Sequence, residues 1–220
     1  MIVLTIDQEG SRRGADRVPE LLDQLASVQT VAGFERTVGD EVQGLLKDTK
    51  AACAAICLTM RMGGWHIGIG IGQVDDDVLA EIRSGTIRTG RGSAFIYARE
   101  AVEQAKKHAV SLAVVADNSE ENRGEAGAAD VRDRSLPAQL QAILHLIGVV
   151  VSSRTPAQRE VVDLLATGMT GREIAMALAI SEPSVSRRRR LAHVAEEEAA
   201  WPVVENMLAE LDTRVNHVGE

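Results

Sequence analysis

Three helix-start signals follow one another closely in the C-terminal part of the chain, at Thr155, Thr170 and Ser181. A hydroxyl at the N-cap accepts a hydrogen bond from a free backbone N–H of the first turn, and a Gln or Glu three residues later completes a capping box. Gln158 and Glu173 stand at that position after the two threonines. This spacing leaves room only for short helices joined by tight turns, so the segment is predicted to form a small helical unit.

The second and third helices of this unit have the pattern of a helix-turn-helix. Ala175 is small where the two helices must cross, and Ile180 and Val185 can fill their shared core. The third helix, from Glu182 to about His193, is polar and contains four consecutive arginines. The alternative to DNA binding is that these arginines are only the solvent-exposed charged side of a helix that packs in the core. We expect base or phosphate contacts from exposed polar side chains of this unit: Arg172, Glu182, Ser184, Ser186, Arg187, Arg188 and Arg190.

A known DNA-binding motif has the same pattern. The stretch GREIAMALAISEPSVSRRRRLA, residues 171–192, resembles the helix-turn-helix of sigma-factor region 4 and of LuxR-type regulators, E-I-A-x-x-L-x-I-S-x-x-[TS]-V. The resemblance implies that double-stranded DNA is the partner and that the third helix reads it.

The charge of the chain is unevenly distributed. The net charge of −8, from 24 Lys and Arg against 32 Asp and Glu, excludes a uniformly basic nucleic-acid-binding surface. Residues 154–193 carry seven basic and four acidic side chains, whereas residues 194–220 carry one basic and seven acidic ones. The basic character is therefore local. Aromatic residues are too few for the base-stacking surface of single-strand-binding proteins: Phe34, Phe95, Trp65, Trp201 and Tyr97.

A polar, glycine-containing stretch, residues 117–134, predicts a linker between a domain at 1–116 and a domain at 135–220. Leu136–Val151 is apolar almost all round, so we expect it to be buried between domains, helices or subunits. Residues 202–217 predict a further helix that starts at Pro202 and either closes its own core or pairs with a second copy. Because a single helix-turn-helix usually needs a dimer for useful affinity, we predict a homodimer.

The first 116 residues predict the element order βαββαβαβ, an antiparallel or mixed sheet covered by helices of the ferredoxin-like type. The expected fold class is therefore α+β, a ferredoxin-like sandwich followed by an all-α helix-turn-helix domain. The glycines of HIGIGIG, residues 66–72, predict close packing against a central strand. The expected strands are Ile2–Ile6, Val31–Val38, Val42–Leu46, Trp65–Ile71 and Val110–Val115, and the expected helices are Val18–Val28, Ala51–Met62 and Ser93–Lys107.

Two carboxylates of this domain are candidates for chemistry. Asp7 ends the first strand and Asp40 lies in the turn of a hairpin, so the side chains could converge. Two close carboxylates repel unless a cation neutralises them, which favours Mg²⁺ or Mn²⁺ with a nucleotide phosphate. The alternative makes Asp7 a loop cap and Asp40 an ordinary turn residue. Separately, Arg91, Gly92 and Ser93 precede a helix and could hold an anion, or Ser93 could simply be its N-cap.

Nearly the whole domain resembles the SatD family of bacterial proteins, through TIDQEGSRR (5–13), VGDEVQGLL (38–46), HIGIGIG and GRGSAFIYAREAVEQAK (90–106). More distantly, the same segments resemble class III nucleotidyl cyclases. That resemblance implies a ferredoxin-like fold, metal binding by Asp7 and Asp40, and a base-selecting position at Arg36. Ile96 and Glu100 stand at the cyclase Asn and Arg positions. Because Glu100 would repel phosphate, cyclisation is not expected, while nucleotide binding stays open.

Cys53 and Cys57 are four residues apart on one face of an apolar helix, which favours core thiols over a disulfide or a metal site. Without a signal-peptide pattern or an apolar run long enough to span a bilayer, we expect a soluble cytoplasmic protein with no membrane partner. Three hypotheses follow. The protein is a transcription regulator whose N-terminal domain senses a small ligand such as a nucleotide, a metal-dependent nucleotide-processing enzyme, or a DNA-binding protein whose N-terminal domain only dimerises.

Overall fold

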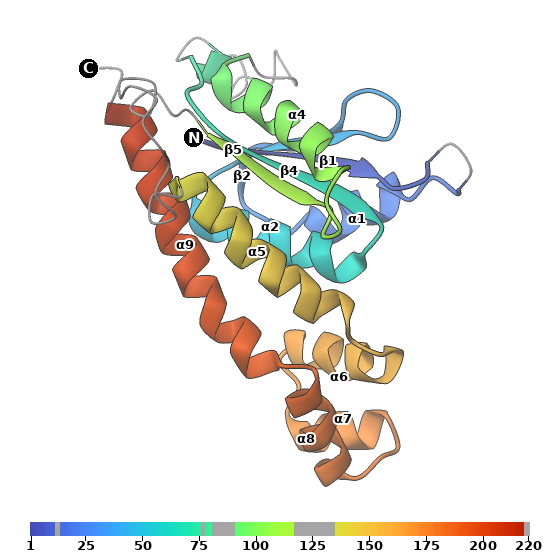
Figure 1. The fold of residues 1–220 in the computed structure, drawn as a ribbon. Helices are drawn as coiled ribbons and strands as arrows, with labels where there is room; N and C mark the ends of the chain where they lie inside the picture. Colours follow the sequence, from blue (N-terminus) through green and yellow to red (C-terminus); the bar gives the residue numbers. More distant parts are fainter. Residues whose placement is uncertain (12–13, 76–77, 81–90, 117–134, 218–220) are drawn as a thin grey trace.

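The computed structural model describes residues 1–11, 14–75, 78–80, 91–116 and 135–217 (Figure 1). The N-terminal part contains a mixed five-stranded sheet packed with helices, and an all-helical region follows, as the sequence predicts. The predicted linker, 117–134, lies outside the described residues. The N-terminal elements are β1 (Ile2–Gln8), α1 (Val18–Leu25), β2 (Thr30–Arg36), β3 (Val42–Leu46), α2 (Thr49–Met62), β4 (Trp65–Ile71), α4 (Ser93–Ala105) and β5 (Leu112–Ala116).

The strand order of the sheet is β2-β3-β1-β4-β5. All neighbouring strands are antiparallel except β4 and β5, which are parallel. In the first four strands, β3 lies between β1 and β2, and β1 lies between β3 and β4. This is the interleaved arrangement of a ferredoxin-like sheet. The fifth strand is added beside β4 through α4, because parallel neighbours need a crossover connection.

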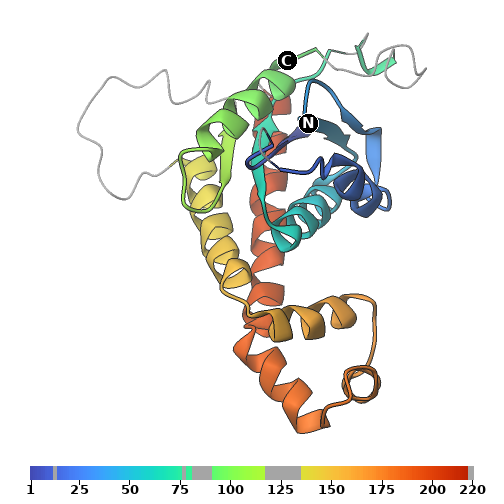
Figure 2. The same ribbon diagram turned by 90° about the vertical axis from the view of Figure 1, so that its right-hand side faces the viewer.

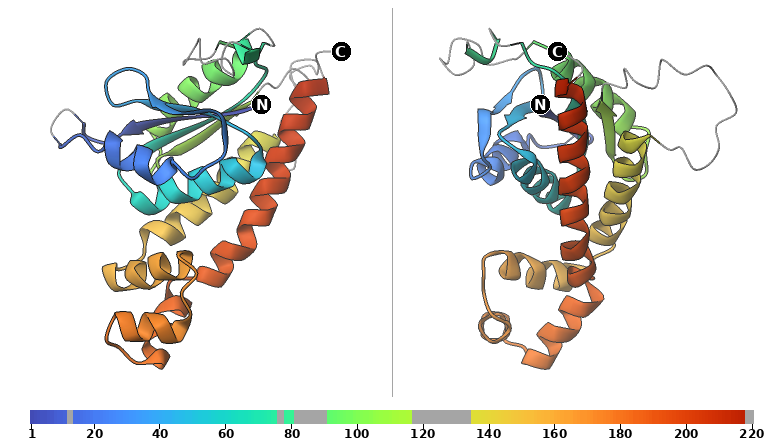
Figure 3. Two further views of the ribbon diagram at one scale, coloured as in Figure 1. Left: turned by 180° about the vertical axis from the view of Figure 1, so that it is seen from behind. Right: turned by 90° about the vertical axis from the view of Figure 1, so that its left-hand side faces the viewer.

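The two faces of the sheet are covered by different helices (Figure 3). Alternate side chains of β1, such as Leu4 and Ile6, belong to a large core with α1, α2 and two helices of the C-terminal region. Val3, between them, points to the other face and packs with Phe95 of α4. The period of two along a strand therefore divides β1 between two cores.

Glycines of β4 allow α4 to lie directly on the sheet. Gly68, Gly70 and Gly72 face α4, while the isoleucines between them enter the large core. A Cβ added to Gly70 would lie 2.2 Å from the backbone nitrogen of Ala98, and one added to Gly68 would lie 2.3 Å from the Ala98 carbonyl oxygen. Both separations are shorter than any real contact, so the predicted role of these glycines in close packing is confirmed.

The C-terminal region begins with α5 (Leu136–Ser152) and ends with α9 (Val194–His217), which lie side by side (Figure 2). Leu140 and Leu144 of α5 and Leu208 of α9 are buried in the same core as the sheet. Gln141 and His145 of α5 also bond the backbone of β5, with Oε1 accepting from the Val114 N–H at 2.9 Å and Nε2 lying 2.8 Å from the Leu112 oxygen. One side of α5 is therefore built into the sheet-bearing part.

Within one chain, the side of α5 away from the core is open to solvent, since Leu146 and Val149 are 68% and 55% exposed, so the burial of this side between subunits stays a prediction. One feature of α9 differs from the prediction. Helix α9 begins at Val194 and contains Pro202 rather than starting there. Burial of Val194 and Glu197 in the first turns stabilises the earlier start, although Pro202 cannot donate a backbone hydrogen bond.

Between α5 and α9 lie α6 (Pro156–Ala166), α7 (Gly171–Ala177) and α8 (Glu182–Leu191), at the lower end of the molecule in Figure 1. They enclose a small core of their own, formed by Val161, Ile174, Ala175 and Val185. Within the described part of the chain, no single helix is long and apolar enough to span a bilayer. By length and composition α5 and α6 would suffice only together, and they are bent by 114° at their junction.

Candidate nucleic-acid interface and carboxylate pair

Reciprocal hydrogen bonds start the first two helices of the small unit. The Thr155 hydroxyl accepts from the Gln158 N–H at 3.4 Å, and the Gln158 side chain accepts from the Thr155 N–H at 2.8 Å. Thr170 and Glu173 make the same pair of bonds at the start of α7. Both predicted capping boxes are confirmed.

The helix-turn-helix itself is formed by α7, a tight turn and α8. The backbone of Ala179 in the turn has a φ of 51°, and the Ile180 N–H donates to the Ala175 oxygen at 3.0 Å. The Ser181 hydroxyl then accepts from the Ser184 N–H at 3.4 Å and caps α8. Local hydrogen bonds therefore determine the geometry of both helices.

One face of α8 is basic and open to solvent. Ser186, Arg187 and Arg190 are exposed, and Arg190 follows the other two by four and three residues, so all three lie on the side of the helix opposite the buried Val185. Neither arginine forms an ion pair with any residue that the structure describes. Arg172, at the start of α7, and Glu182 are exposed as well.

Other predicted DNA-contacting side chains are engaged within the protein. Arg188 is half-buried against α6, where it donates to the Ala157 oxygen at 3.4 Å and lies 3.7 Å from a Glu160 oxygen. Ser184 is half-buried, with its hydroxyl 2.9 Å from that of Ser181. The four arginines therefore differ, because the period of a helix turns Arg188 toward α6 and Arg187 and Arg190 toward solvent.

A buried carboxylate joins the helix-turn-helix to the rest of the chain. Glu197 of α9 is 3% exposed. Its Oε2 accepts a hydrogen bond from Arg154 at 2.5 Å, and its Oε1 accepts one from Arg61 at 3.0 Å. The Cys57 thiol and the Trp201 indole N–H donate to the same Oε1 at 3.5 and 3.4 Å. We call these five residues the Glu197 cluster.

The Glu197 cluster connects three parts of the fold. Arg61 and Cys57 belong to α2, which packs on the sheet. Arg154 follows α5 and is itself 3% exposed. Its Nε donates to the backbone oxygen of Ala192, at the end of α8, over 2.9 Å. The orientation of α8 relative to the sheet therefore depends on these buried charges.

Electrostatics keep Glu197 ionised within the cluster. Burial disfavours the charged form of Glu197, but hydrogen bonds and the positive charges of Arg154 and Arg61 outweigh burial and hold the pKa of Glu197 below its usual range. Burial raises the pKa of Cys57 to about 11, so this thiol keeps its proton and can donate to Glu197. Both cysteines are free, as predicted.

The burial of Glu197 was not expected from the sequence, because this residue stands in the run Glu196-Glu197-Glu198, which resembles a solvated acidic face. A signal was nevertheless present. Glu197 is in helical register with the apolar stripe of Trp201, Val204 and Leu208, so it had to point inward if the helix extended that far.

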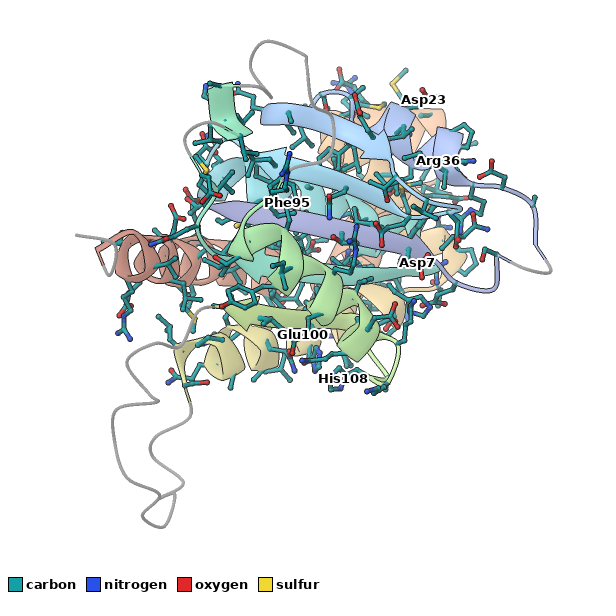
Figure 4. The ribbon with its side chains drawn as sticks, turned by 90° about the horizontal axis from the view of Figure 1, so that it is seen from above. Asp7, Asp23, Arg36, Phe95, Glu100 and His108 are labelled. Carbon is teal, nitrogen blue, oxygen red and sulfur yellow. The ribbon has the colours of Figure 1, made fainter. Side chains whose placement is uncertain are left out.

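The structure brings Asp7 and Asp40 together at one end of the sheet, where Figure 4 shows Asp7. Ile6 of β1 lies opposite Val42 of β3, so the next residue of β1 faces the turn that carries Asp40. The two carboxyl groups are close enough for each to shift the pKa of the other. Burial and the neighbouring Asp40 raise the pKa of Asp7 despite the opposing effect of Lys106, whereas hydrogen bonds from Ser11 and Asp7 lower the pKa of Asp40 against its own burial.

Lys106 supplies positive charge to this pair. Lys106 directly follows α4, and its Nζ lies 2.8 Å from Oδ2 of Asp7. In the described ranges no three His, Cys, Asp or Glu side chains gather as a metal-binding group. Asp7 and Asp40 can supply two of the six oxygens that Mg²⁺ needs, with water or phosphate supplying the rest, once Lys106 moves from Asp7.

Arg36 lies at the same end of the sheet (Figure 4). Its Nη2 makes two short contacts with the Asp16 carboxylate, at 2.5 and 2.6 Å. Both residues line an open pocket of about 310 Å³ together with Asp40 and Ser11. The pocket is polar, but the one arginine among its described lining residues is already paired.

Arg91, Gly92 and Ser93 lie at the opposite end. Ser93 contacts Gln73, and the residue before Gln73, Gly72, donates a backbone hydrogen bond to Met1. Met1 directly precedes β1, whereas Asp7 is near the other end of that strand. Gly92, not Ser93, is the N-cap of α4, because the Ser93 hydroxyl accepts from the Gln73 N–H at 2.8 Å. Within one chain, this segment and Arg36 therefore cannot hold the same small ligand.

Ile96 and Glu100 are on the exposed side of α4. Glu100 accepts a hydrogen bond from Gln104 of the same helix at 3.1 Å. A search of family models, of curated proteins and of solved structures with this chain finds no match in any of the three.

Proposed function

We propose that this protein is a DNA-binding transcription regulator that acts in the cytoplasm and that its N-terminal part responds to a small ligand. The observation that carries the proposal is the exposed, unpaired pair Arg187 and Arg190 on the outward face of the second helix of a helix-turn-helix. The resemblance of residues 171–192 to sigma-factor region 4 and LuxR-type regulators supports the same function.

The chemistry of the face fits duplex DNA. Arginines free of carboxylate partners can neutralise phosphates, and side chains near the start of α8, such as Glu182 and Ser186, can reach base edges. The acidic residues of α9 would disfavour non-specific contacts outside this face, because they repel phosphate.

Replacing Arg187 and Arg190 by Ala is expected to weaken binding to mixed-sequence duplex DNA roughly tenfold or more and to reduce the salt dependence by about two ion equivalents, since each phosphate contact releases about one counterion. Fluorescence anisotropy over a series of salt concentrations measures both quantities. Arg214→Ala, which removes an exposed arginine paired with Glu210 on α9, is the matched control and should change neither. Equal salt slopes for the wild type and the double variant would refute the proposal.

We also propose a homodimer that uses the outward face of α5. This helix has no charged residue in its sequence, and Leu146 and Val149 form an apolar surface on it. A face without charge can pack against its own two-fold copy without like-charge repulsion. Such a contact would also set the separation of two α8 helices, which paired half-sites require.

Leu146→Lys with Val149→Lys should convert the dimer to a monomer, because four buried lysines would face one another across the contact. Sedimentation equilibrium measures the mass. Val38→Lys is the control, since Val38 is an exposed apolar residue of the β2–β3 turn, away from α5. A wild-type chain that is monomeric at high micromolar concentration would contradict the dimer.

A second candidate function, metal-assisted nucleotide binding or processing, is favoured by the convergence of Asp7 and Asp40. Calorimetry with ATP and Mg²⁺ tests binding, and product analysis after incubation tests turnover. Asp40→Asn should weaken nucleotide binding at least tenfold, because it removes one of the two carboxylate ligands. Unchanged affinity in that variant, or no heat of binding in the wild type, would exclude this role.

A further inference from the structure

A cavity of about 150 Å³ lies between the sheet and the helices that lead to the helix-turn-helix. It is partly open to solvent and is bordered by the end of α2, the starts of β4 and β5, and the end of α5. Its lining is mixed but more apolar than polar, and it includes Thr59, Met60, Trp65, Val110, Gly148 and Ser152. A volume of this size can hold one aromatic ring.

The chemistry of the walls favours a neutral occupant. No Lys, Arg or His is among the described lining residues, and the one carboxylate among them, Glu9, is substantially exposed. Arg17, which donates to the Gly63 oxygen of the lining, is paired with Glu20, and His66 lies beside Glu9. Among the described residues, a nucleotide or another anion would therefore meet only cationic side chains that already face a carboxylate. The pocket beside Asp40 and Arg36, in contrast, is polar and is lined by charged side chains.

The indole ring of Trp65 forms part of the cavity wall. The side chain is 3% exposed, and its indole nitrogen is buried without a partner among the residues that the structure describes, so this nitrogen does not face the open cavity. An occupant would therefore meet the apolar part of the ring. The ring itself is held in place from outside the cavity, with the Arg17 guanidinium 5.5 Å from its centre.

The cavity adjoins the Glu197 cluster along two chain segments. Met60 lines the cavity and the next residue, Arg61, bonds Glu197. Ser152 lines the cavity, and Arg154, two residues on, bonds both Glu197 and the end of α8. One nitrogen of Arg61 and one of Arg154 are buried without a described partner, so this arrangement leaves polar groups that a different packing could satisfy.

We propose that this cavity binds a small neutral molecule, about the size of one aromatic ring, and that its occupancy changes the orientation of α8 through the Glu197 cluster. The proposed ligand binding depends only on the cavity, whereas the proposed effect on DNA binding rests on the proposed function. By reciprocity, DNA that favours one orientation must change ligand affinity by the same factor.

The test titrates the full chain with benzyl alcohol, a neutral ring with one hydroxyl acceptor, by calorimetry. We expect saturable binding of one molecule per chain, and at least tenfold weaker binding of benzoate, because burying its charge without a counter-ion is costly.

Met60→Trp should abolish binding by filling the cavity, and Ala109→Trp does the same from its exposed rim if the first variant fails to fold. Asp40→Asn, in the other pocket, is the control and should bind like the wild type. Failure of the wild type to bind benzyl alcohol saturably would overturn the site, as would undiminished binding in both tryptophan variants.

The coupling is tested by repeating the DNA titration with saturating benzyl alcohol. A change in DNA affinity of threefold or more that disappears in Met60→Trp supports the proposal, and unchanged DNA affinity with the cavity occupied overturns the coupling. If the chain binds benzyl alcohol but no DNA at any salt concentration, the proposed function fails while the site stands.

Discussion

Glu197→Ala is expected to lower the free energy of unfolding by about 3–5 kcal/mol, because it leaves the positive charge of Arg154 buried without its partner. Arg61 loses the same partner, and the hydrogen bonds from Cys57 and Trp201 are lost as well. Urea unfolding followed by far-UV circular dichroism measures the change. Because the cluster joins α2, α8 and α9, the loss should appear in one cooperative transition of the whole chain.

Glu198→Ala is the matched control for this effect. Glu198 is the next residue of the same helix, but its side chain is exposed and lies 3.8 Å from Arg189, so its removal should cost less than about 0.5 kcal/mol. Equal losses in the two variants would show that Glu197 makes no special contribution. The pH dependence has a defined sign, since the pKa of Glu197 is lowered by folding. Its contribution is present above the unfolded pKa and is lost as the pH falls through the folded pKa.

Gly70→Ala is expected to lower the free energy of unfolding by about 3 kcal/mol, since the added methyl group would meet backbone atoms of α4 that cannot move singly. Relief of the contact requires the whole of α4 to shift away from β4. Gly33→Ala in the exposed β2 is the control, because a Cβ there meets nothing within 4 Å. Thermal and urea unfolding of both variants gives the comparison, and a Gly70 variant as stable as the Gly33 variant would contradict the packing.

The consequence of Gly70→Ala extends to the carboxylate pair. Lys106 follows the last turn of α4 and reaches Asp7 only because the helix lies close to the sheet. A shift of α4 should therefore remove the ion pair between Lys106 and Asp7. A packing contact near the middle of β4 thus controls the charge at one end of the sheet.

The helix-turn-helix could be predicted from sequence in detail. Its capping residues, Thr155, Thr170 and Ser181, act on backbone groups within the next three positions, so their spacing alone defines where the helices start. The order of helices and strands along the chain was predicted as well, because a continuous apolar run such as that of β1 is typical of a strand buried on both faces.

The candidate sites were predicted less completely, since they depend on which elements meet. Asp7 and Asp40 come together through the register of β1 and β3, and Lys106 joins them from α4. Arg91 is at the other end of the sheet, although its loop had the composition of an anion site. In α8, four identical arginines differ because Arg188 faces α6 while its neighbours face solvent or α9.

By itself, the sequence determined the short-range structure of this protein: where helices start, which strands are buried, and where the basic residues are concentrated. Only the tertiary structure decided that Glu197, within a run of three acidic residues, is the buried partner of Arg154 and Arg61. The physical reason is one of range. A helix cap is satisfied within one turn of its own chain, whereas a buried charge is stable only when partners from distant elements are brought to it.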